Sequence, residues 1–474
     1  MPAFFVENFG CRATQADGAA LERQFEERGL TRAASPSQAS VVILNTCTVT
    51  NGADQDARAA IRRVRRQNPD ARIVVTGCYA QRAPEEIAAL PGVDLVVGNS
   101  HKHQLAEIAI PNLDRTPEVQ SNFVSAKALT GNGVLSTERS AENAIFVSDI
   151  FAHTELLAAP VFDAANERTR PNLKIQDGCD NRCSFCVIPY VRGQSRSLAP
   201  DRILAEVNTL VNAGFKEVVI SGINLGRWGR DLPPNVGTAA IGRPGERSSP
   251  LSLAAIIRAI LAETTLQKLR ISSVEPMDWS DDLISLVASS PRIAKHAHVP
   301  MQSGSDAVLR RMHRKYRPWH YREKIERIRS AMPTAAIGAD VMVGFPGETD
   351  VEFESTRKMM QDLPFTYLHV FTYSARPGTR AAEMVKHVPV QIARERNRIL
   401  RELVSEKKLA FMRSFVGKTL QAITLNVIGS DAQGEFTEAL TDNYLKLRLH
   451  GRHQANTWRT VTVQNVVSGS LTGR

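Results

Sequence analysis

The chain is organised by a repeated alternation of short apolar segments and longer stretches with helical periodicity. In the first 110 residues the apolar segments are "AFFVEN", "VVILN", "ARIVV" and "DLVV". Strands of parallel sheets are buried on both faces by the connecting helices, so they are apolar throughout rather than at alternate positions. The same pattern predicts helices near residues 19–29, 54–67 and 84–90. We therefore expect residues 1–111 to form an α/β domain with a doubly wound parallel sheet.

Three cysteines occupy equivalent places in this predicted sheet. Cys11, Cys47 and Cys78 each come just past the end of an apolar segment. Open parallel sheets place their ligand sites at the carboxyl ends of the strands. A single buried cysteine is usually a packing residue, but three in the same topological position favour convergence on one site.

A second alternation begins after residues 112–165, which lack clear periodicity and are predicted to be a linker or strap, although "AIFVSDIFAH" is a candidate strand. Strands are predicted at residues 173–175, 217–221, 268–272, 296–300, 338–344 and 367–373. Five helical segments lie between them. Six such units are too few for an eight-stranded barrel and favour a partial (β/α)6 barrel over residues 166–411, with its chemistry at the carboxyl ends of the strands.

The last part of the chain has a different pattern. A basic helical stretch at residues 391–411 leads into four short β candidates separated by turn residues, in "LQAITLNVI", "EFTEALT", "YLKLRLH" and "WRTVTVQNVV". This pattern predicts a small all-β barrel over residues 412–474.

Composition limits the environment and the partners. The chain has no run of about 18 apolar residues and no basic stretch leading into an apolar one at its start, which predicts a cytoplasmic protein without a membrane partner. In that reducing compartment its six cysteines are not expected to form structural disulfides. Lys and Arg exceed Asp and Glu by 59 to 49, which favours a polyanionic partner, with nucleic acid the first candidate.

The strongest local signal is "DGCDNRCSFC", directly after the first predicted barrel strand. Its cysteines Cys179, Cys183 and Cys186 have the spacing C-x3-C-x2-C. A structural zinc site would need a fourth ligand, and no Cys or His follows closely. In a 4Fe–4S cluster three thiolates leave one of the four irons open to bind a further molecule. The motif therefore favours a reactive iron–sulfur cluster.

At this motif the sequence resembles the radical S-adenosylmethionine (SAM) superfamily, in which the open iron binds SAM. The segments "NFGCRATQ", "NTCTVTNGAD", "VVTGCYAQ" and "GCDNRCSFCVIPYVRGQSRS" extend the resemblance over nearly the whole chain to the methylthiotransferase family. Members have an N-terminal three-cysteine domain, a radical SAM barrel and a C-terminal TRAM domain. The resemblance implies a second 4Fe–4S cluster held by Cys11, Cys47 and Cys78, at which sulfur is attached for transfer.

Within this family, "TCTVTNGAD" resembles the branch that acts on N6-threonylcarbamoyladenosine 37 of tRNA. The isopentenyladenosine branch usually has an Arg-Glu pair where this chain has Thr50 and Asn51. Thr14 stands where the family usually has Asn, and Asp17 alone represents an acidic residue common nearby. Neither departure removes a cluster ligand, but each could alter the support of Cys11.

The resemblance implies a radical SAM methylthiotransferase that uses two SAM molecules. One donates a methyl group to sulfur, and the other yields a 5′-deoxyadenosyl radical that takes hydrogen from C2 of the adenine. Implied partners are the tRNA anticodon loop, an electron donor such as flavodoxin or ferredoxin, and a sulfur source. Three alternatives stay open: the isopentenyladenosine branch, the branch that modifies an aspartate of a ribosomal protein, and an RNA-binding protein with structural clusters.

Candidate SAM contacts are polar or small residues at the predicted strand ends, and no catalytic residue is expected beyond the cluster ligands. These contacts are Gly222, Asn224, Ser273, Glu275, Gln302 and Asp340. Each polar member could instead cap a helix or bind a loop amide. The glycines are weak evidence singly.

Candidate RNA contacts lie in two basic segments. The predicted helix after Cys47 carries Arg58, Arg62, Arg63, Arg65 and Arg66. Several of these share a face at helical spacing, although a charge run is usually only a solvated surface. The last segment combines Lys446, Arg448, Arg452 and Arg459 with Tyr444 and Trp458, a mixture suited to phosphate contact and base stacking.

Overall fold

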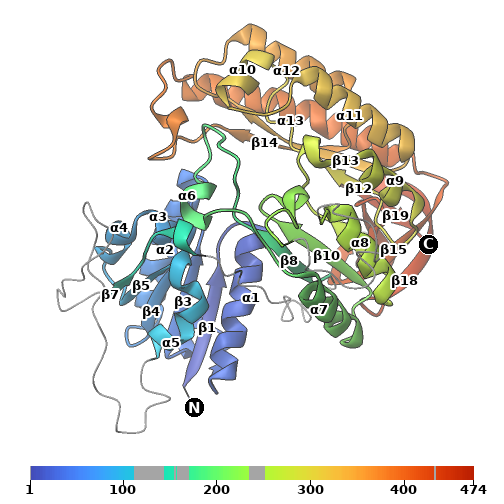
Figure 1. The fold of residues 1–474 in the computed structure, drawn as a ribbon. Helices are drawn as coiled ribbons and strands as arrows, with labels where there is room; N and C mark the ends of the chain where they lie inside the picture. The colour runs from blue at the N-terminus through green and yellow to red at the C-terminus, as the bar shows by residue number, and fades with distance from the viewer. Residues whose placement is uncertain (1, 111–143, 154–155, 157–169, 234–250, 432–433) are drawn as a thin grey trace.

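The computed structural model describes residues 2–110, 144–153, 156, 170–233, 251–431 and 434–474 (Figure 1). Its N-terminal part is a six-stranded sheet of order β2-β1-β3-β4-β5-β7, and every neighbouring pair of strands is parallel. The strands are β1 (Ala3–Asn8), β2 (Thr31–Arg32), β3 (Val41–Thr46), β4 (Arg72–Gly77), β5 (Leu95–Gly98) and β7 (Ala144–Phe146).

Helices cover both faces of this sheet, so the doubly wound α/β prediction is confirmed. They are α1 (Arg12–Glu27), α2 (Asn51–Gln67), α3 (Cys78–Arg82), α4 (Pro84–Ala88) and α5 (Leu105–Ala109). Two separate apolar clusters fill the two faces: Val42 and Leu44 of β3 point into one, and Val41 and Ile43 into the other. This explains why the strand is apolar at successive positions.

One detail differs from the sequence-based expectation. Helix α1 begins at Arg12, immediately after Cys11, which is earlier than the predicted start near residue 19. Strand β7 is formed by the first three residues of "AIFVSDIFAH", the candidate strand within the predicted linker, and it pairs with β5 at the edge of the sheet. The other residues of that predicted linker lie largely outside the described residues.

The central part is an open barrel of six parallel strands, as predicted. The strands are β8 (Asn172–Asp177), β10 (Glu217–Gly222), β11 (Lys268–Ile271), β12 (His296–His298), β13 (Ala336–Val343) and β14 (Tyr367–Thr372). They form two hydrogen-bonded sheets, β11-β10-β8 and β12-β13-β14, and a bridge between Ser273 and His298 joins the two. A short strand β9 (Arg196–Ser197) pairs antiparallel with β8.

The outer face of the barrel is apolar and its inner face is largely polar. The outer helices are α7 (Pro200–Asn212), α8 (Leu253–Glu263), α9 (Asp281–Ser289), α11 (Pro318–Ala331) and α12 (Asp350–Asp362), with α10 (Asp306–Arg311) preceding α11. Residues such as Ile220 and Val341 join the core under these helices. Because side chains alternate along a strand, the intervening positions face inward. These include Lys174, Gln176, Ser221, His298, Asp340 and His369.

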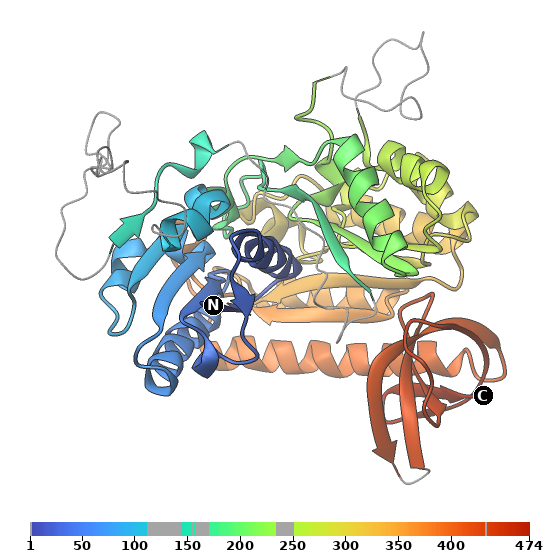
Figure 2. The ribbon, with the colours of Figure 1, turned by 90° about the horizontal axis from the view of Figure 1, so that it is seen from below.

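The N-terminal domain lies against the open side of the barrel, where α1 contacts β8 (Figures 1 and 2). On the outer side of β14, the long helix α13 (Val390–Arg413) runs toward the C-terminal domain. That domain is a closed barrel of order β15-β16-β17-β19-β18. Its strands are β15 (Thr419–Asp431), β16 (Gly434–Thr441), β17 (Lys446–His450), β18 (Trp458–Val467) and β19 (Ser470–Gly473).

The C-terminal barrel also closes one end of the central barrel. The ring of Tyr444 lies 4.8 Å from that of His296 and 5.7 Å from that of Tyr367, both at the amino-terminal ends of their strands. The guanidinium of Arg270 donates to the carbonyl oxygens of Thr441 and Asp442. The opposite, carboxyl-terminal ends of the strands carry the cysteine motif. Within the described part of the chain, every helix is too short or too polar to cross a bilayer.

Candidate functional site

The three N-terminal cysteines lie at neighbouring strand ends, after β1, β3 and β4. Cys47 and Cys78 are buried, whereas Cys11 is exposed. Gly10 has φ +98°, and a Cβ there would lie 2.5 Å from the Cβ of Cys47. Only glycine allows the loop that carries Cys11 to pass this close to Cys47.

Burial, with the neighbouring thiols of Cys78 and Cys11, raises the pKa of Cys47 to about 12. The free thiol is therefore protonated at neutral pH, and iron binding would release its proton. Asn99 Nδ2 lies 3.6 Å from the Sγ of Cys78, to which it donates, and Thr14 Oγ1 lies 3.6 Å from the Sγ of Cys11. The threonine that replaces the family's usual asparagine thus still contacts the cysteine.

The second cysteine site follows β8. Asn224 Nδ2 donates to the Sγ of Cys179 over 3.6 Å, and Arg314 Nη1 donates to the Sγ of Cys183 over 3.3 Å. Burial and the thiol of Cys183 raise the pKa of Cys186 to about 12. Three sulfur donors with N–H donors directed at them fit an iron–sulfur cluster, whose thiolates accept such hydrogen bonds.

One short helix connects the two cysteine sites. Helix α6 (Ile188–Arg192) begins two residues after Cys186. Val187 and Val191 pack with Cys78 in a single buried cluster. Asn99 Nδ2, which donates to Cys78, also donates to the carbonyl oxygen of Val191 over 2.7 Å. The structure therefore holds the two sites as neighbours through direct contacts.

A buried ionic network fixes the same junction. Asp17 of α1 pairs with Lys102, with Lys174 of β8 and with Arg192 of α6. Lys174 and Arg192 also bind Asp177. Burial alone would raise the pKa of Asp17, but the charges of Arg192, Lys102 and Lys174 lower it below its usual range. The carboxylate is ionised and links the N-terminal domain to the barrel.

A second group of hydrogen bonds and ion pairs holds the loop after Cys47. Thr48 Oγ1 donates to Asp54 Oδ1 over 2.6 Å, and Arg82 Nη2 donates to Asp54 Oδ2 over 2.9 Å. Arg376, which follows β14, donates to Thr48 Oγ1 over 2.7 Å and pairs with Asp54. The opening of the barrel lies between β8 and β14. Both of its edges are thus bonded to the N-terminal domain.

Four of the SAM candidates lie beyond the ends of β10, β11 and β12, and Gly222 is the last residue of β10. Asn224 contacts Cys179, as described above. Glu275 forms an ion pair with Arg314, which itself reaches Cys183. Gln302 has φ +62°, and its backbone N–H donates to the carbonyl of Asp340 over 2.8 Å. Ser273 bridges to His298.

Asp340 does not lie at a strand end, as its sequence position suggested. It lies inside β13, because this strand extends from Ala336 to Val343. Its Oδ1 is 3.3 Å from Nε2 of His298. The sequence pattern does not show where the strand ends within the glycine- and valine-rich segment that contains Asp340. The roles of all six SAM candidates stay predictions.

Several residues that contact these sites were missed by the sequence analysis. Arg314, Asn99 and Arg376 are reached only through the fold, and no local pattern distinguishes them from other polar residues. His298 and His369 had a weak signal, since each lies on a predicted strand in register with inward-facing neighbours.

The arginines of α2 divide into two groups. Arg58 donates to the Tyr79 hydroxyl over 2.8 Å and pairs with Glu86. Arg63 and Arg65 pair with Glu7 and Asp94. Arg62 and Arg66 are exposed. The RNA role predicted for this helix therefore has its most accessible charges at Arg62 and Arg66.

In the C-terminal barrel Lys446, Arg452 and Arg459 are exposed, whereas Arg448 is partly buried. Lys446 pairs with Glu438, Arg452 with Glu435 and Arg448 with Asp431, and the guanidinium of Arg448 lies 4.6 Å from the ring of Phe436. Tyr444 packs onto the end of the central barrel, so the expectation that it stacks on a base does not fit its position.

Comparison with known proteins matches both halves of this site. Residues 3–98 match the family described as "Uncharacterized protein family UPF0004", and residues 173–360 match the radical SAM superfamily. A threonylcarbamoyladenosine tRNA methylthiotransferase MtaB of Aquifex aeolicus is 35% identical over 94% of this chain and 96% of its own length. The MtaB of Bacillus subtilis is 34% identical over 95% and 91%.

Other relatives carry a different name. A tRNA-2-methylthio-N(6)-dimethylallyladenosine synthase of Novosphingobium aromaticivorans is 33% identical over 89% of this chain and 86% of its own length. Among solved structures, the radical SAM methyltransferase TsrM of Kitasatospora setae superposes with a TM-score of 0.55 at 14% identity, over 81% of this chain and 77% of that one. This last likeness supports the fold alone.

Proposed function

The chain belongs to the tRNA methylthiotransferases of the radical SAM superfamily, and from this premise we propose that it inserts a methylthio group at C2 of N6-threonylcarbamoyladenosine 37 in tRNA. The MtaB relatives named above support this substrate over dimethylallyladenosine. The observation that carries the proposal is the pair of three-cysteine sites, which α6 and Asn99 hold in contact.

The donor sets fit two 4Fe–4S clusters, with Cys179, Cys183 and Cys186 at one and Cys11, Cys47 and Cys78 at the other. When bound, the clusters and SAM supply the radical and the sulfur that replace the hydrogen at C2. Asn224 and Arg314 donate hydrogen bonds to the sulfur atoms of one site, and Asn99 to a sulfur atom of the other. These donors stabilise negative charge on the sulfurs.

Residues near the barrel ends are the proposed SAM contacts. Gly222 ends β10, Asn224, Ser273 and Glu275 follow β10 and β11, on the side of Cys179 and Cys183, and Gln302 lies beyond β12. Gly222 leaves room for the side chain of Gln176, whose Oε1 accepts from the backbone N–H of Asn224 over 2.7 Å. This bond fixes the loop that would hold the amino group of SAM.

The proposed partners follow from the same family. The tRNA anticodon loop would contact the exposed Arg62 and Arg66 and the basic C-terminal barrel, which we propose to be a TRAM-type RNA-binding domain. Lys446, Arg448 and Arg459 are its candidate contacts. A cytoplasmic reductant such as flavodoxin or ferredoxin and a separate sulfur source complete the reaction.

The test is turnover by the reconstituted protein. Anaerobic protein with SAM and a reductant is incubated with tRNA that carries threonylcarbamoyladenosine at position 37, and the digested nucleosides are analysed by mass spectrometry. We expect the methylthio derivative of that nucleoside. Methylthiolation of isopentenyladenosine tRNA only, under the same conditions, would overturn the substrate assignment.

Iron content tests the two-cluster arrangement independently. Two four-iron clusters require about eight irons per chain, and replacement of Cys179, Cys183 and Cys186 together by Ala should leave about four. Cys47→Ala should spare part of the SAM cleavage and stop methylthiolation. About four irons falling to none in the triple variant would show that the N-terminal cysteines hold no cluster.

A further inference from the structure

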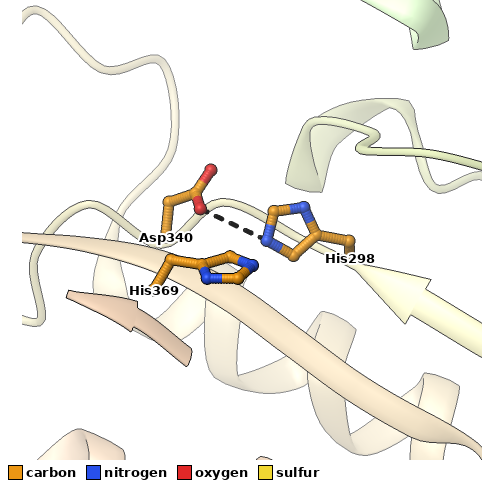
Figure 3. A group of neighbouring side chains, drawn as sticks. All are labelled: His298, Asp340 and His369. Atoms are coloured by element: carbon orange, nitrogen blue, oxygen red, sulfur yellow. Dashed lines mark ion pairs between the residues drawn. The ribbon is translucent and has the colours of Figure 1, made fainter. Parts of the chain in front are cut away.

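Three polar side chains on the inner face of the barrel lie together, apart from both cysteine sites. His298 of β12, Asp340 of β13 and His369 of β14 come from three neighbouring strands and point toward one another (Figure 3). One ring nitrogen of each histidine and one carboxylate oxygen of Asp340 lie within 4.8 Å of one another. His298 Nε2 is 3.3 Å from Asp340 Oδ1. They form a polar cluster, which we call the inner triad.

Strand register explains why these side chains meet. Asp340 is the direct partner of His369 across β13 and β14, and Gly338 is the partner of both His298 and Tyr367. A Cβ at Gly338 would lie 2.0 Å from the ring of Tyr367. The glycine therefore lets Tyr367 lie under the triad, where its ring stacks 5.9 Å from that of His298.

The triad lies midway along the barrel. Tyr367, His296 and Tyr444 close the end below it. The carboxyl-terminal ends of the strands, which bear the cysteine motif and the proposed SAM loops, lie above it. A base substituent of a nucleoside that entered from the carboxyl-terminal ends of the strands would reach the triad before it reached the rings of Tyr367, His296 and Tyr444.

Polar atoms on the inner face lack partners among the described residues. Ser221 Oγ and Asn172 Oδ1 are buried and make no hydrogen bond there, and His298 Nε2 makes none either, although Asp340 Oδ1 lies 3.3 Å from it. Buried polar atoms in native proteins almost always have a partner, so an unpaired set on one inner face indicates a polar ligand. An isopentenyl group offers no hydrogen-bonding atom and would leave them unpaired.

We propose that His298 and His369 donate ring N–H groups to the carboxylate of the threonylcarbamoyl group, and that Asp340 accepts a hydrogen bond from its hydroxyl or N–H. This assignment rests on the proposed function and deepens it. It explains selection of threonylcarbamoyladenosine over isopentenyladenosine, since only the former carries an anion together with donors.

The test compares two anticodon stem-loop RNAs in fluorescence anisotropy with the anaerobically reconstituted full chain. One RNA carries threonylcarbamoyladenosine, and the other carries its carboxamide, which lacks the anionic charge. The native protein should bind the carboxylate form about ten-fold more tightly, as expected for a charge-assisted hydrogen bond. His369→Ala and His298→Ala should each reduce this preference severalfold or abolish it.

A matched control is His320→Ala, since His320 is an exposed histidine near the start of α11. It should keep the preference. Iron content equal to that of the native protein shows that each variant is folded. The comparison of the two RNAs with the native protein measures the preference without any variant. An unchanged preference in both His369→Ala and His298→Ala would overturn the subsite.

Two further results separate the subsite from the proposed function. If the native protein methylthiolates threonylcarbamoyladenosine but binds both RNAs equally, the subsite is wrong and the function stands. If it does not act on threonylcarbamoyladenosine, both fail. One equivalent of zinc in the purified protein that His369→Ala removes would assign the triad to a metal and overturn the proposal.

Discussion

Asp17 shows how one residue can decide the relation of two domains. Its buried carboxylate contacts three cations that come from the N-terminal domain, from β8 and from α6. A buried charge is costly unless it is paired and hydrogen-bonded, and removal of one partner leaves the others uncompensated. The acidic residue noted beside Cys11 in the sequence thus has a structural reason to be charged.

Asp17→Asn is predicted to destabilise the protein by about 3–5 kcal/mol, because Lys102, Lys174 and Arg192 would lose their shared counter-charge. Urea denaturation at pH 7 measures the loss. As a control, Asp282→Asn removes an exposed pair with Arg258 and should cost less than about 1 kcal/mol. Equal effects of the two variants would contradict the network.

The same carboxylate gives a pH signature. The pKa of Asp17 is lower in the folded chain than its unfolded value near 4, so its stabilising contribution is complete above that value. The contribution is lost as pH falls from about 4 toward the lower folded pKa. The stability difference between the native protein and Asp17→Asn should therefore be constant from about pH 5 to 8 and shrink in acid. A difference that grows on acidification would have the wrong sign.

Arg314 is predicted to tune the cluster of the barrel. Its guanidinium donates to Cys183 and lies beside the sulfur donors, so it favours the more negative, reduced cluster. Arg314→Gln should lower the reduction potential by roughly tens of millivolts. A redox titration followed by electron paramagnetic resonance, in a background without Cys11, Cys47 and Cys78, measures the shift. Arg310→Gln, on the exposed side of α10, should leave the potential unchanged.

At the scale of elements, the strongly patterned segments were predictable and the contacts between them were not. Continuous apolar runs identified the strands of the N-terminal sheet, the alternation of strand and helix patterns identified those of the barrel, and position after a strand identified the cysteine sites. Helix α6 was not predicted, because five residues that include a proline carry no clear period. Strand β19 was missed for a similar reason, since its four residues end in glycine.

The loop after β14 and the loop after Cys47 form one unit through Arg376. Arg376→Ala should release the segment from Cys47 to Asp54, because two hydrogen-bonded contacts to a buried carboxylate and to Thr48 are lost. Amide hydrogen exchange in that segment should accelerate about ten-fold or more, as loss of a charged hydrogen bond requires. Arg380→Ala changes an exposed residue of the same connection and should not affect it. Unchanged exchange in Arg376→Ala would show that the loop is held by other contacts.

At the scale of the whole molecule, the pairs that assemble the site are distant in sequence. Arg314 and Cys183 are 131 residues apart, Lys174 and Asp17 are 157 apart, and Arg376 and Asp54 are 322 apart. Local periodicity contains no information on such pairs. The donor cysteines could be named from sequence, whereas the side chains that support them required the fold.

RNA binding is expected to spread over the surface of the C-terminal barrel. Arg459→Gln removes an exposed charge on β18, so it should weaken tRNA binding and reduce the slope of log affinity against log salt by about 0.7, the value for one single-strand phosphate contact. Binding at several salt concentrations measures the slope. Arg398→Gln on α13 is the control, because Glu395 and Glu402 already pair with that arginine. The same slope in Arg459→Gln and the native protein would exclude Arg459 from the contact.

The position of α6 has a consequence for how the enzyme could be inactivated or regulated. Because Cys78 packs directly on the helix that begins after Cys186, these contacts set the spacing between the two reactive centres when the chain folds. A substitution of Val187 or Val191 would therefore change the distance between the two cysteine sites. Such a variant could retain all six ligands and still deliver sulfur and radical to different places.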